Sequence, residues 1–180
     1  MALTEKLSPE FRRICEAIAT ERRSLLRLRA FDPLPADTLA ADLGATLFTP
    51  EKVPNADLEK VDVLLASDQW SAAVISPDPL WILYNPSHAP VRRESNVMHE
   101  LAHVLLRHAM VNFEPETGLP KRRQSDEDEA TYLGGCLQIP RRGLLWAVQR
   151  QMALPQIAVH FGASEEMVKF RSNVTGVKVI

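Results

Sequence analysis

The chain has 180 residues, a length typical of one domain or of one domain with a small appendage. Apolar residues make up 46% and charged residues 24%, a composition that excludes a disordered chain. The net charge of −2 provides no overall attraction to nucleic acid. We therefore expect a single folded domain over residues 1–180, with helices and a small sheet in residues 1–140 and a helical part in residues 141–180.

The cysteine content indicates a reducing compartment. Cys15 and Cys136 are far apart in sequence and do not have a metal-binding spacing. The first residues lack the apolar stretch of a signal peptide, and no run approaches the ~18 apolar residues of a membrane span. The sequence thus predicts a cytoplasmic protein without a membrane partner.

Hydrophobic periodicity predicts two helices and a strand in the first fifty residues. From Pro9 to about Ala30, apolar residues recur at helical spacing and arginines occupy the other faces, so we expect an amphipathic helix with a basic outer face. Pro33 and the residues beside it end this helix. A second helix is predicted from Ala36 to Leu43, followed by a short strand over Ala45–Thr49.

The sequence predicts a β-hairpin in the middle of the chain. Residues 50–68 are polar and weakly periodic, and we expect at most a short helix there, around Asp57–Leu65. Two strand-like runs follow, Trp70–Ser76 and Leu80–Tyr84, separated by a turn that contains two prolines. The strand Leu80–Tyr84 is a candidate exposed edge that would bind an extended peptide.

The second half of the chain is predicted to be helical. A helix capped by Ser95 or Asn96 runs to about His108, and a long loop spans Phe113–Ser125. Further helices are expected over Asp126–Gln138, Arg142–Met152, Leu154–Phe161 and Glu165–Arg171. The predicted fold class is α+β, mostly helical, with a small antiparallel sheet.

The strongest chemical signal is the motif His99-Glu100-Leu101-Ala102-His103 within a predicted helix. Imidazoles four residues apart lie on one face of a helix, so His99 and His103 can bind one Zn²⁺. Glu100, next to the first histidine, is placed to act on a water molecule bound to that ion. This pattern predicts a zinc metallopeptidase with His99 and His103 as ligands and Glu100 as the catalytic residue.

A catalytic zinc usually has a third protein ligand, and three residues are candidates. His108 lies five residues after His103 and would project about 140° away from it in a continuous helix, so capping of the helix end is its simpler role. Glu127 and Glu129 open the following predicted helix. Glu127 is favoured because Thr131 follows it on the same face, where its hydroxyl would support a histidine ligand.

Two stretches resemble the ImmA/IrrE family of zinc metallopeptidases. They are ILYNPSHAPVRRESNVMHELAHVLLRH and EDEATYLGGCLQIP, which are similar to the family's strand, NP loop, HExxH helix and Glu-bearing helix in that order. The resemblance implies a gluzincin-like site with His99, His103 and Glu127 as zinc ligands and Glu100 as the catalytic residue. The chain departs from the family pattern at four places: Ser95, Asn96, Thr131 and the pair Gly134-Gly135.

The resemblance also implies a regulatory substrate. Family members are associated with the cleavage or inactivation of helix-turn-helix repressors in stress responses, mobile elements and toxin–antitoxin systems. We therefore expect a zinc-dependent endopeptidase that cuts one specific intracellular protein, a helix-turn-helix transcriptional repressor or antitoxin. The sequence does not identify the group that would stabilise the oxyanion; its candidates are Tyr84, His108, Tyr132 and His160.

The alternative is a zinc-stabilised transcriptional regulator or protein-interaction module without hydrolytic activity. Residues 157–168 resemble a helix-turn-helix centred on Gly162. The second helix of this unit begins with Glu165 and Glu166, which repel phosphates, so packing is a better explanation for it than DNA binding. The basic N-terminal helix and the run Lys121-Arg122-Arg123 are candidate partner surfaces, although solvated basic faces are common.

Overall fold

The structure is a computed structural model that describes residue 3 and residues 7–108, 112–113, 120–121 and 123–179. It confirms a mostly helical α+β fold. The described helices are α1 (Pro9–Leu25), α2 (Ala36–Asp42), α3 (Leu58–Leu65), α4 (Pro90–Leu106), α5 (Gln124–Gln138), α6 (Arg141–Gln149), α7 (Leu154–Phe161) and α8 (Glu165–Thr175). The described strands are β1 (Thr46–Phe48), β2 (Ala72–Pro77), β3 (Leu80–Tyr84), β4 (Asn112–Phe113) and β5 (Pro120–Lys121), and a 3₁₀ turn covers Pro50–Lys52.

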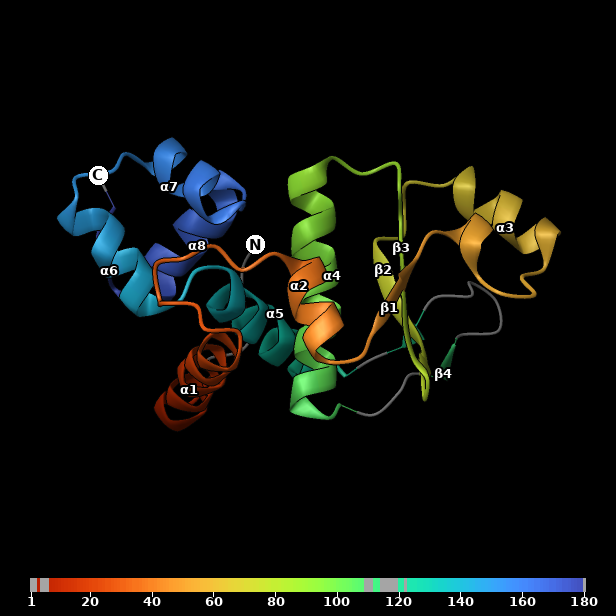
Figure 1. The fold of residues 1–180 in the computed structure, drawn as a ribbon, viewed down its shortest axis with the longest axis horizontal. Helices are drawn as coiled ribbons and strands as arrows, with labels where there is room; N and C mark the ends of the chain where they lie inside the picture. The colour runs from red at the N-terminus through yellow and green to blue at the C-terminus, as the bar shows by residue number, and fades with distance from the viewer. Residues whose placement is uncertain (1–2, 4–6, 109–111, 114–119, 122, 180) are drawn as a thin grey trace.

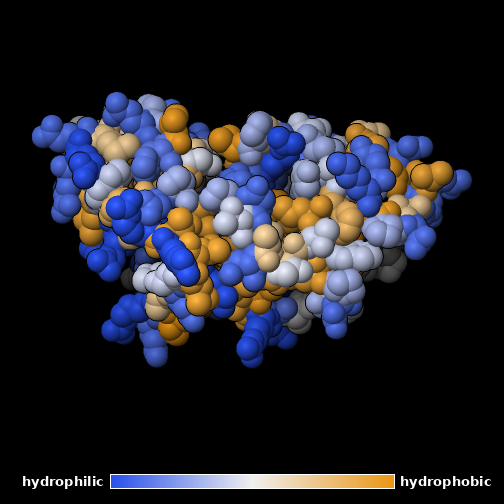
Figure 2. Space-filling view, viewed as in Figure 1, coloured by the Kyte–Doolittle hydropathy of each residue, from blue (hydrophilic) through white to orange (hydrophobic). Residues whose placement is uncertain are grey.

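Helix α4 stands in the middle of the molecule, between the sheet on one side and the C-terminal helices α6, α7 and α8 on the other (Figure 1). Helix α5 passes behind α4, and α1 lies beside α5. On the face seen in Figure 2, the outer helices present mainly hydrophilic residues, and hydrophobic residues gather nearer the middle.

Helix α1 is shorter than predicted, and its buried face differs from the predicted one. Ser8 caps its start by accepting a hydrogen bond from the Phe11 amide at 3.1 Å, but Arg27 adopts a left-handed conformation, so the helix ends at Leu25 instead of Ala30. Cys15 and Ala19 form the buried stripe together with Arg23, which is only 1% exposed. The prediction that all the arginines of this helix lie on its outer face was therefore wrong for Arg23.

The three-stranded sheet has the order β1-β3-β2. Strands β2 and β3 form the predicted antiparallel hairpin, whereas β1 pairs with β3 in parallel, so the sheet is mixed. Strand β3 has a neighbour on both sides, and the hypothesis that Leu80–Tyr84 is an exposed edge was therefore wrong. The edge strands are β1 and β2.

Helix α4 begins six or seven residues earlier than predicted. Pro90 occupies its first turn, where the missing amide proton costs nothing, so Ser95 and Asn96 lie inside the helix rather than at its cap. The Ser95 hydroxyl donates a hydrogen bond to Gln138 Oε1 at 3.1 Å, which ties α4 to the end of α5. Arg107 ends the helix in a left-handed conformation, with φ of 55°.

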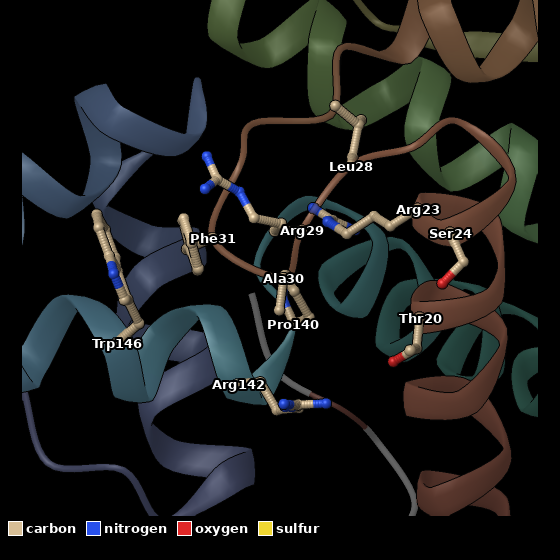
Figure 3. Close-up of a pocket in the computed structure, with 10 residues that line it drawn as sticks. All are labelled: Thr20, Arg23, Ser24, Leu28, Arg29, Ala30, Phe31, Pro140, Arg142 and Trp146. Carbon is tan, nitrogen blue, oxygen red and sulfur yellow. The ribbon is translucent and has the colours of Figure 1, made fainter.

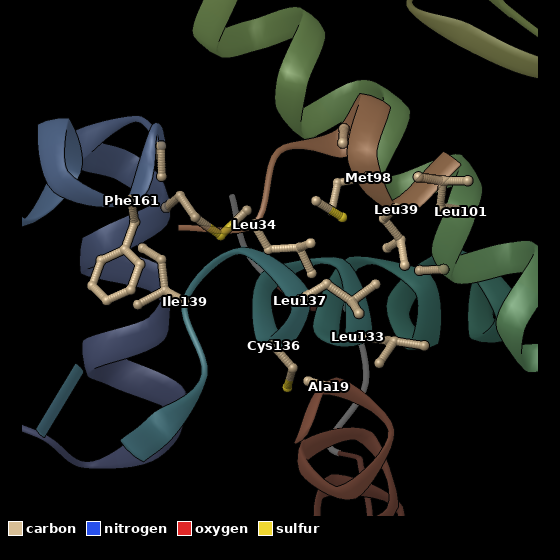
Figure 4. Packing of buried hydrophobic residues seen from close by; sticks show 14 of the residues in the cluster. Ala19, Leu34, Leu39, Met98, Leu101, Leu133, Cys136, Leu137, Ile139 and Phe161 are labelled. Carbon is tan, nitrogen blue, oxygen red and sulfur yellow. The ribbon is translucent and has the colours of Figure 1, made fainter. Parts of the chain in front are cut away.

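Helix α5 lies at the centre of the hydrophobic core. Its buried residues Leu133, Cys136 and Leu137 are surrounded by side chains from α1, α2 and α4 (Figure 4). The same core continues into α6, α7 and α8. The elements that bear the sequence motif and the C-terminal helices therefore share one core.

The C-terminal helices form the expected helix-turn-helix arrangement. Gly162 ends α7 in a left-handed conformation, and Ser164 caps α8 by accepting a hydrogen bond from the Met167 amide at 3.1 Å. Met167 and Val168 are buried, whereas Glu165 and Glu166 are exposed. The exposed start of α8 is therefore acidic, as the sequence indicated.

Most of the loop predicted over Phe113–Ser125 lies outside the described residues. Where it is described, β4 pairs with β5 in antiparallel fashion. Arg122 is not among the described residues, so the surface expected from the run Lys121-Arg122-Arg123 stays a prediction.

Candidate metal centre

Helix α4 places His99, Glu100 and His103 together, as the four-residue spacing predicted. The two imidazole Nε2 atoms lie 3.0 Å apart. His103 and Glu100 are 3% and 5% exposed, whereas 24% of the His99 side chain is accessible to solvent. Metal-ligating atoms of these three residues all lie within 4.8 Å of one another. The His103 imidazole is thus buried, whereas the His99 imidazole is partly accessible to solvent.

Glu127, in the first turn of α5, reaches both imidazoles. Its Oε2 atom lies 3.0 Å from His99 Nε2, and its Oε1 atom lies 3.3 Å from His103 Nε2. Ligands bound tetrahedrally to zinc at about 2.0–2.1 Å stand about 3.3 Å from one another. Two imidazoles and a carboxylate at these separations therefore fit a zinc ion.

The charge state of Glu127 suits metal binding. Partial burial alone would raise the pKa of this carboxyl group, but hydrogen bonds from His103 and His99 outweigh burial and hold the pKa well below its usual range. The carboxylate is therefore ionised at neutral pH.

Glu129 does not face the two imidazoles but supports them through His108. His108 Nε2 donates a hydrogen bond to Glu129 Oε2 at 3.1 Å, and His108 Nδ1 lies 2.7 Å from His103 Nδ1. The prediction that His108 projects away from His103 requires a helix that continues to His108. Arg107 instead turns the chain, so that the His108 amide bonds the His103 carbonyl oxygen at 3.1 Å and its ring packs behind His103.

Helices α4 and α5 pack against each other at Gly134. A Cβ atom at Gly134 would lie 3.5 Å from the His99 Cα atom, at van der Waals contact with the α4 backbone. In the sequence, Gly134 is only a departure from the family pattern.

The loop before α4 is fixed by Asn85, the asparagine of the NP stretch. Its side-chain amide donates hydrogen bonds to the carbonyl oxygens of Ser67 and Trp70, each at 3.0 Å. Its Oδ1 atom accepts a hydrogen bond from the Ser87 amide at 3.0 Å. Asn85 is 1% exposed and orders the chain that leads into the motif helix.

The candidates for oxyanion stabilisation occupy different parts of the fold. The Tyr132 ring lies against Arg12 and Arg171, on the side of α5 that faces α1 and α8. His160 Nε2 donates a hydrogen bond to the Phe31 carbonyl oxygen at 2.7 Å, which fixes it to the loop after α1. Tyr84 lines a hollow with Pro90 and Val97, and His108 contacts the Nδ1 side of His103, away from the clustered Nε2 atoms. Tyr132 and His160 thus lie outside the metal centre.

In the described part of the chain, no helix has both the length and the apolar character that a membrane crossing requires.

Comparison with known proteins identifies the family. A search of curated proteins gives no match. The model of a peptidase family described as the IrrE N-terminal-like domain matches residues 56–173, which include all the residues of the candidate metal centre. The chain belongs to this family of metallopeptidases.

Proposed function

We propose that the protein is a zinc-dependent endopeptidase with His99, His103 and Glu127 as metal ligands and Glu100 as general base. The observation that carries this proposal is the convergence of both Nε2 atoms and the Glu127 carboxylate within 3.0–3.3 Å of one another, beside the buried Glu100. Membership of a metallopeptidase family supports the same chemistry.

The roles of the residues follow from their positions. When bound, zinc acidifies a water molecule and polarises the peptide carbonyl group. Glu100 accepts the proton of the attacking water on its carboxylate and delivers it to the nitrogen of the leaving amine. His99, His103 and Glu127 hold the metal, and the half-exposed side of His99 admits the scissile bond.

The edge strand β2 offers a place for the substrate backbone. In the described sheet β2 pairs with β3 alone, and it packs against α4. An extended peptide added to this edge would make main-chain hydrogen bonds with little demand on side-chain identity.

For the substrate we propose a helix-turn-helix repressor or antitoxin in the cytoplasm, and we treat residues 1–180 as one catalytic unit. The resemblance of the motif stretches to ImmA/IrrE proteins supports this substrate class. The two cysteines are free and buried, in keeping with a reducing compartment. A zinc-stabilised regulator without activity is the alternative, and the acidic start of α8 argues against DNA as its ligand.

The test of activity uses a proteome-derived peptide library, because it needs no known substrate. Zinc-loaded wild type and Glu100→Gln are incubated with the library, and new termini are identified by mass spectrometry. The proposal predicts new termini with the wild type that fall by at least about 100-fold with Glu100→Gln. Absence of new termini with the zinc-loaded wild type would contradict the proposed activity and favour the non-hydrolytic alternative.

A further inference from the structure

A cavity of about 470 Å³ lies between α1, the loop that follows it, and the start of α6. Its walls include Arg23, Phe31, Arg142 and Trp146, and none of the metal-centre residues lines it (Figure 3). The proposed peptide hydrolysis therefore gives this cavity no role.

Arg23 is a buried cation without a matched counter-ion. It is 1% exposed, and its Nη2 atom donates a hydrogen bond to the Gln138 carbonyl oxygen at 3.2 Å. Its Nε and Nη1 atoms have no hydrogen-bond partner in the described part of the chain. Burial lowers the pKa of Arg23 to about 10, so the guanidinium stays charged at neutral pH. A buried charged group with free donors is costly unless an anion or a polar ligand satisfies it.

The two carboxylates whose charges act on Arg23, Asp32 and Glu16, form hydrogen bonds with other groups. Asp32 accepts hydrogen bonds from Arg29 at 3.0 and 3.1 Å. Glu16 pairs with Arg171 and accepts a hydrogen bond from the Arg141 amide at 2.9 Å. The chain therefore supplies no carboxylate of its own to the free donors of Arg23 among the residues described.

The remaining walls combine two further arginines, Arg29 and Arg142, with an aromatic surface. Figure 3 shows Arg23 and Arg142 on opposite sides of the cavity, with Phe31 and Trp146 along one flank. The rings of Phe31 and Trp146 stack with centroids 4.9 Å apart and planes 10° from parallel, and the Arg29 guanidinium lies over the Phe31 ring at 4.4 Å from its centroid. An adjoining cavity of about 420 Å³ shares Arg142 and adds Arg12, Arg13 and Arg141, so the surroundings are basic.

We propose that this cavity binds a small organic anion, a carboxylate or phosphate ester with an aromatic or apolar body. The anionic group would accept hydrogen bonds from Arg23 and lie near Arg142, and the body would rest against Phe31 and Trp146. The site is separate from the metal centre. Its occupancy is expected whether or not the chain hydrolyses peptides.

The test is isothermal titration calorimetry of the full chain with benzoate, phenyl phosphate and the neutral isostere benzamide. We expect saturable binding of at least one anion, about tenfold tighter or more than binding of benzamide, because a charge-assisted hydrogen bond carries much of the affinity. Benzoate against phenyl phosphate distinguishes a carboxylate from a phosphate ligand. Absence of saturable anion binding up to about 10 mM, or equal affinity for benzamide, would overturn the proposal.

Substitutions of the cavity-lining residues test whether the anion binds at this site. Arg23→Gln should remove anion binding, and Arg142→Gln, at an exposed position, should weaken it about tenfold. Arg92→Gln is the matched control, because Arg92 is an exposed arginine of α4 that does not line the cavity, and it should bind as the wild type does. If Arg23→Gln does not fold, the anion affinities of Arg142→Gln and Phe31→Leu test the site instead. Unchanged affinity in both of these would contradict the proposed site.

Discussion

His103 and His108 face each other through their Nδ1 atoms, which lie 2.7 Å apart. One proton must lie between these nitrogens for the contact to be a hydrogen bond. If His103 binds a metal through Nε2, its Nδ1 carries this proton and donates it to His108 Nδ1, and the His108 Nε2 proton is then donated to Glu129. His108 and Glu129 thus fix the orientation and tautomer of His103, a proposed zinc ligand.

His108→Ala and Glu129→Gln should therefore weaken zinc binding. Residues that orient metal-binding histidines typically contribute 10- to 100-fold in affinity, so we expect a loss of about 10- to 100-fold for His108→Ala and a smaller loss for Glu129→Gln. Competition with a chromophoric chelator measures the affinity. Glu165→Gln, an exposed carboxylate of α8, is the control and should be unchanged. Wild-type zinc affinity in His108→Ala would contradict the positioning role.

The adjacent glycines of α5 should respond oppositely to alanine. At Gly134 the added Cβ would meet only ordinary contacts at 3.5 Å or more, and alanine favours a helix by up to about 1 kcal/mol, so Gly134→Ala should be neutral or stabilising. At Gly135 it would lie 2.9 Å from Cδ of the buried Arg171, so the free energy of unfolding should fall by about 1–3 kcal/mol. Urea unfolding measures both variants, and a shift of the same sign in both would refute this packing argument.

Removal of the metal should lower the stability without unfolding the chain. The core around α5 is built from side chains of six other helices, so the apo protein should still unfold cooperatively. With free zinc at about one hundred times its dissociation constant, binding stabilises the chain by about 2.7 kcal/mol, or roughly 5–10 °C in Tm. Calorimetry with and without a chelator measures this shift. A chain that loses its helical circular dichroism on chelation would contradict the expectation.

Both cysteines should be inert in the native protein. Cys15 and Cys136 are 0% exposed. Burial, together with the Glu129 charge, raises the pKa of Cys15 to about 12. Burial also raises the pKa of Cys136. At pH 8 only about one Cys15 thiol in ten thousand would be ionised. A thiol-reactive disulfide reagent should label two thiols in urea and neither without it. Rapid native labelling of either one would show that the α1–α5 packing is wrong.

Local patterns were sufficient to predict the helices, the hairpin and the motif residues. The His99/His103 spacing needs only helical geometry, and the first-turn position of Glu127 puts it within reach of both imidazoles. The parallel β1–β3 pairing was missed because it joins segments distant in sequence, which no local period encodes.

The contact of His108 with His103 and the burial of Arg23 were also missed. The left-handed Arg107 turns His108 toward His103, and such conformations are uncommon outside glycine. Arg23 enters the core although the charge pattern placed it outside, because its long side chain reaches the Gln138 carbonyl oxygen.

Zinc content and zinc X-ray absorption of the wild type, Glu127→Gln and Glu129→Gln test whether His99, His103 and Glu127 hold the metal. The account predicts one zinc per wild-type chain, bound by two imidazole nitrogens and by oxygen at about 2.0–2.2 Å. Glu127→Gln should lose most of its zinc, and Glu129→Gln should retain the same coordination with weaker affinity. A wild type that binds no zinc, or that binds it equally well after Glu127→Gln, would contradict the account.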